Sequence, residues 1–152
     1  MAGPIGFLGE AENTLDGKGR LAVPATMRRA MNPEANETFV AVRGFEPCVI
    51  LYPLDEWEKI SAQLQGKNEF VARNRAFVRS MTRRAEVVSL DSQGRVSLSK
   101  SLIEYASLEP GAKATVLGAI TYLEVWNPAL LDEQDALDDP SASLAEQVMG
   151  EV

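Results

Sequence analysis

The chain has 152 residues and a formal net charge of −7; 45% of its residues are hydrophobic and 24% are charged. This composition predicts one ordinary domain, or two very small ones, with a hydrophobic core, and it excludes wholesale disorder. No apolar run reaches about 18 residues, and no basic flank precedes an apolar N-terminal stretch. We therefore expect a cytoplasmic protein without a membrane span or a signal peptide.

The residue types exclude several kinds of catalytic and metal site. The chain has no histidine, which removes Ser-His-Asp and Cys-His nucleophile systems and histidine metal ligands. Its single cysteine, Cys48, cannot form an internal disulfide or a thiolate zinc site alone, and its apolar neighbours predict a small buried side chain in a strand. Carboxylate-based or lysine-based catalysis stays open, but no phosphate-binding glycine loop is visible. We predict a protein that is not an enzyme and that uses no cofactor or metal.

The negative charge is unevenly distributed along the chain. Residues 129–152 contain seven acidic and no basic residues, so residues 1–128 contain 15 of each. Two clusters in this neutral part are basic, one at residues 18–29 and one at residues 67–84. A basic surface on a neutral body is compatible with a polyanionic partner, and the alternative is a pair of solvated helix faces.

An internal repeat with an offset of 75 residues is the most informative feature of the sequence. The stretch LDGKGRL at residues 15–21 recurs as LDSQGRV at residues 90–96. Pro53 and Pro128 are also 75 residues apart, and each follows an apolar run and precedes an acidic helix start. Two signals in the same order at the same offset indicate two copies of one unit. The predicted organisation is a leader (1–6), a first copy (7–56), a helical connector (57–84), a second copy (85–128) and an acidic tail (129–152).

The first copy begins with a strand–turn–strand pattern, because Asp-Gly and Gly-Arg pairs flanked by apolar residues favour a hairpin. Pro24 suits the first turn of a short helix over residues 25–31. Residues 38–43 and 48–52 are rich in β-branched and aromatic residues and predict two further strands, with Gly44 in the turn between them.

The connector predicts two helices, because both of its halves carry stripes at helical spacing. Gly66 separates the halves. The apolar stripes are Leu54, Trp57, Ile60 and Leu64 in the first helix and Phe70, Phe77 and Met81 in the second. The second helix also carries a basic stripe of Arg75, Arg79 and Arg83.

The second copy repeats the order of the first. Ser99 is placed to cap a short helix, and residues 113–118 and 121–126 predict two strands. Four short strands in each copy leave open edges and little core. We therefore expect the two copies to cover each other in a closed, pseudo-symmetric β-barrel.

The acidic tail is expected to start as a helix after Pro128. Two roles for it stay open. It either repels DNA or competes for the basic clusters, or it packs on the barrel or on a neighbouring subunit. The apolar residues available for packing are Leu130, Leu131, Leu144 and Val148.

The repeated motif carries the candidate functional residues. Asp16 and Arg20, and again Asp91 and Arg95, have the spacing Asp-x-x-x-Arg across a turn. In one interpretation, the aspartate closes the turn and the arginine ends a strand. In the other, the arginine presents its planar guanidinium to phosphates or to guanine, with Lys18 beside the first copy's motif.

At these residues the chain resembles the MraZ family of bacterial cell-division regulators, which are built from two SpoVT/AbrB-like units. The resemblance covers residues 7–128. The matching stretches are residues 15–24 (LDGKGRLAVP), residues 49–57 (VILYPLDEW), the arginine-rich segment 73–84 and residues 90–98 (LDSQGRVSL).

The resemblance implies an α+β fold in which two tandem swapped-hairpin, AbrB-like units form one pseudo-symmetric β-barrel with flanking helices. It implies a DNA-binding transcriptional regulator that acts at promoter direct repeats upstream of the division and cell-wall gene cluster. Repression of its own operon, a ring-shaped homo-oligomer and a nucleoid-associated location follow from the same resemblance.

The resemblance also assigns roles to the motif residues. It places DNA contacts on Arg20, Lys18 and Arg95. The second copy has Gln93 in place of the lysine, so we expect it to contact DNA less. The residues with a structural role in the motif are Asp16, Gly19, Asp91 and Gly94.

Two other functions stay open. An oligomeric structural or interaction protein of the same fold would use its arginine-rich helices for subunit contacts and bind no DNA. An RNA-binding or methyltransferase-associated accessory protein is the second, although no methyl-donor site is visible. Salt-dependent binding to promoter DNA separates the first of these from a regulator.

Overall fold

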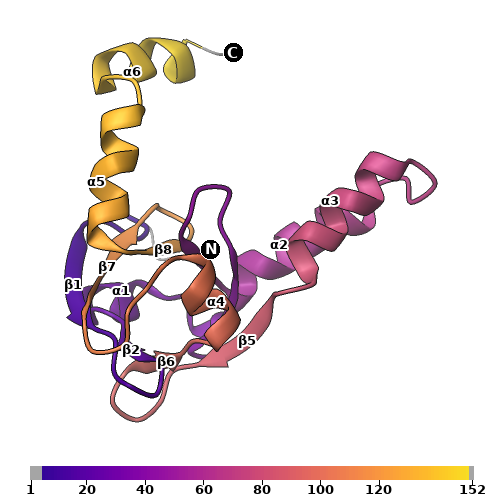
Figure 1. The fold of residues 1–152 in the computed structure, drawn as a ribbon. Coiled ribbons are helices and arrows are strands. Elements are labelled where there is room, and N and C mark those ends of the chain that lie inside the picture. The colour runs from indigo at the N-terminus through magenta and orange to yellow at the C-terminus, as the bar shows by residue number, and fades with distance from the viewer. Residues whose placement is uncertain (1–4, 151–152) are drawn as a thin grey trace.

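The fold is a mixed α+β arrangement, which a computed structural model describes for residues 5–150 (Figure 1). Residues 1–4 of the predicted leader lie outside the described residues. In chain order, the elements are β1 (Glu10–Thr14), β2 (Arg20–Ala22), α1 (Ala25–Ala30), η1 (Pro33–Ala35), β3 (Thr38–Arg43), β4 (Val49–Pro53), α2 (Leu54–Gln65), α3 (Ala72–Thr82), β5 (Glu86–Ser89), β6 (Arg95–Ser97), α4 (Lys100–Tyr105), β7 (Lys113–Gly118), β8 (Leu123–Trp126), α5 (Pro128–Leu137) and α6 (Ser141–Met149).

Strands from both copies share each sheet. One antiparallel sheet has the order β1-β7-β8-β4-β3-β5, and a two-stranded ribbon pairs β2 with β6. The order is symmetric about the β8–β4 pair, so that β7 and β3, and likewise β1 and β5, occupy equivalent places. The first strand of each copy therefore completes its hydrogen bonds on the other copy, β1 on β7 and β5 on β3.

The closed barrel is not confirmed. In the part of the chain that the structure describes, the edge strands β1 and β5 do not pair with each other. The ribbon lies at this opening instead, with β2 in contact with β1 and β6 in contact with β5. Among the described residues, no ladder joins β2 to β1 or β6 to β5, so the ribbon remains a separate two-stranded sheet.

The hydrophobic core forms on both faces of the six-stranded sheet. Phe39 and Ala41 belong to a cluster that also contains Leu21 and Val96, which face each other in the ribbon. The neighbouring residues of β3 point to the opposite face and join a second cluster under α2. Strand β3 is therefore buried along almost its whole length, as expected for a strand covered on both faces.

The short helices follow the predictions from their sequences. Helix α1 begins after Pro24, and the hydroxyl of Ser99 accepts a hydrogen bond from the backbone N–H of Leu102 at the start of α4. Cys48 is buried as expected, but it lies directly before β4 rather than within a strand. Burial raises the pKa of its thiol to about 12.

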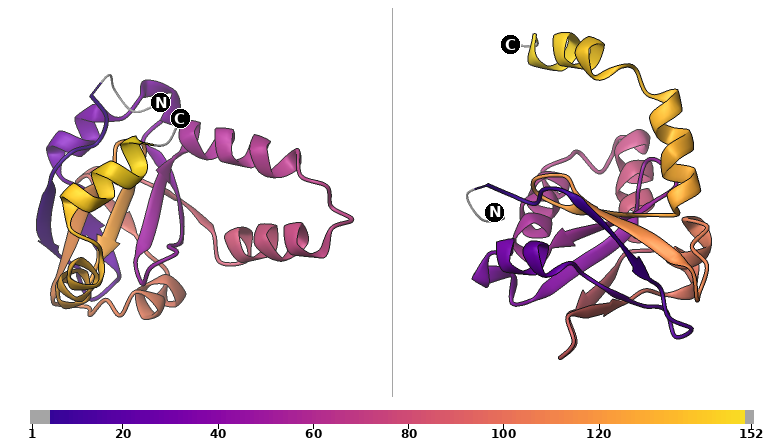
Figure 2. Two further views of the ribbon diagram at one scale, coloured as in Figure 1. Left: turned by 90° about the horizontal axis from the view of Figure 1, so that it is seen from above. Right: turned by 90° about the vertical axis from the view of Figure 1, so that its left-hand side faces the viewer.

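Helices α2 and α3 form an arm that projects from the body (Figure 2). The predicted apolar stripe of α2 packs on the second core cluster, and the helix ends at Gly66. In α3, Met81 is buried, whereas Phe70 precedes the helix and is 86% exposed. The predicted stripe of Phe70, Phe77 and Met81 is therefore wrong at Phe70.

The acidic tail forms two helices, so its helical structure continues past the predicted helix start at Pro128. Helix α5 packs Leu130 and Leu131 against the second core cluster, and α6 follows after Pro140. No residue of α6 is buried. The tail thus has one anchored helix and one helix that makes little contact with the body (Figure 2).

Candidate nucleic-acid interface

The first motif is a turn that Asp16 closes. One carboxylate oxygen, Oδ1, accepts hydrogen bonds from the backbone N–H groups of Lys18 and Arg20, both at 2.9 Å. The other, Oδ2, accepts a hydrogen bond from Nε of Arg20 at 2.6 Å. The same side chain therefore shapes the turn and fixes the direction of the arginine.

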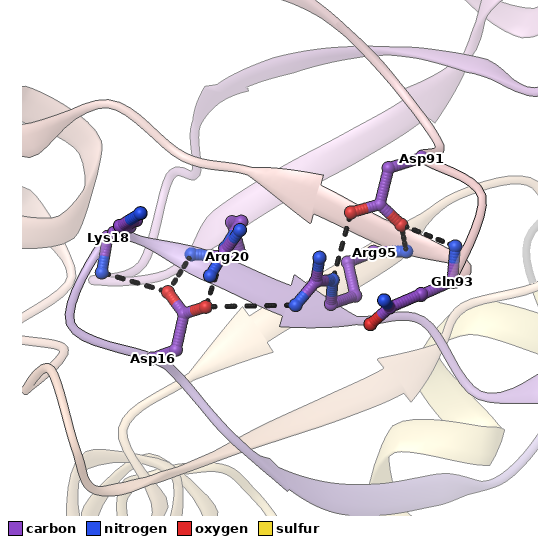
Figure 3. A network of polar contacts seen from close by, with 6 residues as sticks. All are labelled: Asp16, Lys18, Arg20, Asp91, Gln93 and Arg95. Atoms are coloured by element: carbon purple, nitrogen blue, oxygen red, sulfur yellow. Dashed lines mark hydrogen bonds and ion pairs between the residues drawn. The ribbon is translucent and has the colours of Figure 1, made fainter.

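The second motif repeats this geometry. Oδ1 of Asp91 accepts from the backbone N–H groups of Gln93 and Arg95, and Oδ2 accepts from Nε of Arg95 at 2.9 Å. The two motifs are also linked, because Nη1 of Arg95 lies 3.9 Å from Oδ2 of Asp16 (Figure 3). Asp16 consequently faces guanidinium groups from both copies.

Each motif glycine has a left-handed backbone conformation. Gly19 has a φ of +80°, and a Cβ there would stand 2.7 Å from the carbonyl oxygen of Leu98. Gly94 has a φ of +75°, and a Cβ there would stand 2.7 Å from Cζ of Arg28. The left-handed backbone favours glycine at both positions, and the backbone neighbour adds a second reason at Gly19. At Gly94 the neighbour is the end of a flexible side chain, which can move.

The carboxylates of the two motifs are held in their charged form. The backbone N–H of Arg20 is the main group that lowers the pKa of Asp16 to about 2, and the guanidinium of the same residue adds to this effect. The backbone N–H of Arg95 lowers the pKa of Asp91 in the same way. Both aspartates are therefore ionised at neutral pH and can hold an arginine by a charge-assisted hydrogen bond.

The pairing of β2 with β6 brings the predicted site residues together (Figure 3). Arg20 lies opposite Ser97, and Arg95 lies opposite Ala22, so the two arginines belong to one small ribbon. Their side chains are 34% and 25% exposed, which leaves each guanidinium partly open to solvent. Lys18 lies in the first turn, and Gln93 occupies the corresponding place in the second.

The structure adds one basic residue that the sequence did not assign to the motif. Arg28 of α1 lies against Gly94 of the second turn, and its Nε donates a hydrogen bond to the carbonyl of Val23 at 3.0 Å. The residue at the equivalent place beside Gly19 is Ile103. Arg28 thus supplies a cation beside the turn that lacks a lysine. In the sequence, only its position in the basic cluster at residues 18–29 pointed to Arg28.

A second lysine accompanies the first motif. Lys18 and Lys100 both line a surface depression of about 300 Å³, together with Gly19 and Pro110. The ribbon is therefore flanked by a cation at each motif turn. Such an arrangement suits an extended anion better than a small enclosed ligand.

Neither a metal site nor a membrane span accompanies the ribbon in the part of the chain that the structure describes. Within residues 5–150, no group of three or more aspartate, glutamate or cysteine side chains could hold a metal ion. No helix in this range is both long enough and apolar enough to cross a membrane.

A family model described as "MraZ protein, putative antitoxin-like" matches residues 7–80 and again residues 81–148. The chain belongs to the MraZ family. The two matches divide the chain at the end of α3, in agreement with the internal repeat. The second match includes α5 and most of α6, so the family pattern continues into the acidic tail.

Curated relatives carry one functional name. The chain is 39% identical to "Transcriptional regulator MraZ" of Desulfitobacterium hafniense (strain Y51) over 144 residues, which cover 94% of this chain and 96% of the relative. It is 35% identical to the protein of that name from Christiangramia forsetii over 150 residues, which cover 96% and 94%. The protein of that name from Cytophaga hutchinsonii is 37% identical over 145 residues, with 94% of each chain covered. The family is named for transcriptional regulators and not for an enzyme activity.

Proposed function

We propose that the protein is a sequence-specific DNA-binding transcriptional regulator that reads DNA with the β2–β6 ribbon. The observation that carries this proposal is the pair of arginines, Arg20 and Arg95, each held by its own aspartate on one partly exposed ribbon. The names of the relatives support the regulatory role.

The contact between each aspartate and its arginine leaves the Nη groups of the guanidinium available to DNA. Asp16 and Asp91 engage Nε of their arginines, whereas a guanidinium carries four further N–H bonds on its two Nη atoms. Those groups match the O6 and N7 acceptors of guanine and the oxygens of a phosphate. Because each arginine is already oriented by its aspartate, little side-chain entropy is lost on binding.

One chain offers too few reading groups for specific regulation by itself. A bidentate arginine–guanine contact provides about 1–3 kcal/mol of discrimination, whereas specific binding exceeds non-specific binding by about 4–10 kcal/mol. Several copies that engage direct repeats together would supply the difference through avidity. We therefore propose that a ring-shaped homo-oligomer binds promoter direct repeats and has a nucleoid-associated location.

The finer structural and genetic parts of the proposal rest on the family resemblance. The two copies at residues 7–56 and 85–128 would be the swapped-hairpin, AbrB-like units, and the sheet and the ribbon together would form their barrel. The targets would be the division and cell-wall gene cluster, with repression of the protein's own operon.

A mobility-shift experiment tests the proposal. The probes are the DNA upstream of the protein's own gene and a scrambled duplex of the same length. We expect wild-type protein to prefer the upstream DNA, and Arg20→Ala to lose at least about tenfold in affinity for it while it keeps its fold. Arg73→Ala in the arm removes the same charge away from the ribbon and serves as the control.

Equal affinity of folded Arg20→Ala and wild type for the upstream DNA would contradict the assignment of the ribbon. Equal binding of wild type to both probes would contradict sequence specificity. Absence of binding to either probe would favour the alternative of a structural or interaction protein of the same fold.

A further inference from the structure

Helix α6 has an apolar face that no other part of residues 5–150 buries. The exposed fractions of Val148 and Met149 are 59% and 81%, and Leu137 at the end of α5 is 80% exposed. An isolated helix shorter than about 12–15 residues is marginal in water, and α6 has nine. A helix this short needs a packing partner for its apolar face.

The arm offers a matching groove between α2 and α3. Its volume is about 690 Å³. Its lining combines apolar side chains, Leu64 and Val78, with the basic side chains Lys67, Arg75 and Arg79, and one acidic residue, Glu69. The groove therefore combines apolar and basic lining residues, which are the two kinds that a helix with apolar and acidic residues requires.

The charges of the tail and the arm are opposite. Residues 66–84 of the arm, which include α3, contain six basic residues and one acidic residue, and the tail within residues 128–150 contains six acidic residues. Among the residues that the structure describes, no ion pair joins any of them. The basic residues are Lys67, Arg75 and Arg79, which line the groove, and Arg73, Arg83 and Arg84, which lie outside its lining. The acidic residues are Asp132, Glu133, Asp135, Asp138, Asp139 and Glu146.

The two surfaces do not meet within one chain. In Figure 1 the arm extends to the right of the body, whereas α5 rises from the body and carries α6 above it. The view from above in Figure 2 likewise shows the arm directed away from α6. Contact between the tail and an arm consequently requires a second copy of the chain.

We infer that helix α6, with the end of α5, docks into the α2–α3 groove of a second copy. The contact joins two different surfaces, so every copy offers one arm and one tail. Repetition of such a contact builds a ring when the rotation closes. This inference deepens the self-assembly in the proposed function and rests on it, but it does not require DNA binding.

Charge reversal on each side tests the inference. The arm variant carries Arg75→Glu and Arg79→Glu, and the tail variant carries Asp135→Lys and Glu146→Lys. Molar mass is measured by light scattering without DNA, over a range of concentrations at about 150 mM NaCl. We expect either variant to raise the concentration needed for half-assembly by at least about tenfold, because two attractive pairs become repulsive.

Combining the reversed arm with the reversed tail distinguishes loss of the arm–tail contact from general damage to the fold. A chain with all four substitutions should regain the wild-type mass, and so should an equimolar mixture of the two variants. Arg73→Glu changes the charge of α3 outside the groove and should leave the mass unchanged. Far-UV circular dichroism checks that each variant is folded.

Two outcomes would overturn the inference: wild-type mass in both folded reversal variants, or no recovery in the four-substitution chain. A monomeric wild type would overturn it as well. None of these results depends on DNA. The operator affinity of Arg20→Ala, whether lost or unchanged, therefore tests the proposed function separately.

Discussion

Asp16 has two structural roles that the sequence alone does not distinguish. It closes its turn by accepting two backbone hydrogen bonds, and it also holds the guanidinium of Arg20. A structural interpretation and a functional interpretation of the motif are therefore compatible at the level of the atoms. The structural contact fixes the position of the group that the functional interpretation needs.

Arg28 gives a prediction that distinguishes the two motifs. Because this residue lies beside Gly94, we expect Arg28→Ala to weaken operator binding by about tenfold, an effect similar to that of Lys18→Ala at the first motif. The measurement is a titration of labelled upstream DNA with each variant. Arg29→Ala, on the neighbouring helix position, is the control. Wild-type affinity in folded Arg28→Ala would show that the second turn needs no additional cation.

The lowered pKa of Asp16 predicts the pH dependence of this interaction. The folded value of about 2 lies below the ordinary value of 3.8, so the carboxylate stabilises the fold above that ordinary value. This stabilisation should be lost as pH falls from about 4 to about 2. The free energy of unfolding of wild type and Asp16→Asn, measured by urea titration at several pH values, checks it. Their difference should be constant above about pH 5 and should shrink below about pH 4.

At the scale of the elements, the first turn allows a matched pair of glycine variants. Gly19→Ala should lower the free energy of unfolding by about 1–3 kcal/mol, because φ is positive and the new Cβ meets the carbonyl of Leu98. Gly17→Ala in the same turn should change it little, since a Cβ added there would have no atom within 4 Å and the φ of this residue is not positive. Thermal or urea unfolding measures both. Equal stability of the two variants would contradict the packing of this turn.

The strands and short helices were predictable because their signals are local. The offset of 75 residues and the alternation of apolar residues place β3, β4, β7 and β8, and the cap of α4 follows from Ser99. Signals that depend on tertiary packing were not accessible. The approach of Arg28 to Gly94 and the exposure of Phe70 result from how distant segments meet, which no local pattern encodes.

At the scale of the whole molecule, the two motif arginines and the two projecting surfaces lie on different parts of the chain. The sheet and the ribbon form the body that carries the two arginines, whereas the arm and the tail project away from it (Figure 2). Such a division lets copies associate through their extensions without covering the ribbons. The proposed avidity on direct repeats would require this arrangement, because every ribbon would have to stay open to DNA.

Removal of residues 138–152 tests this division in one variant. The truncation keeps α5, whose Leu130 and Leu131 pack against the second core cluster, so the body should stay folded. It removes α6 and four acidic residues and changes the formal charge from −7 to −3. We expect the mass to fall toward that of one truncated chain, which is below the 16.5 kDa of the full chain, and the affinity for the direct repeats to fall with it.

Binding of the truncated chain to random duplex DNA should change in the opposite direction. At about 50 mM salt its affinity per chain should rise, because the basic arm is released and the net negative charge is smaller. Each phosphate that the arm newly neutralises should steepen the slope of log K against log salt by about 0.9. The amide variant Asp138→Asn, Asp139→Asn and Glu146→Gln keeps the apolar face of α6 and should lie between wild type and truncation in both measurements. A truncated chain with the wild-type mass would contradict docking by α6, and an unchanged salt slope would contradict the release of the arm.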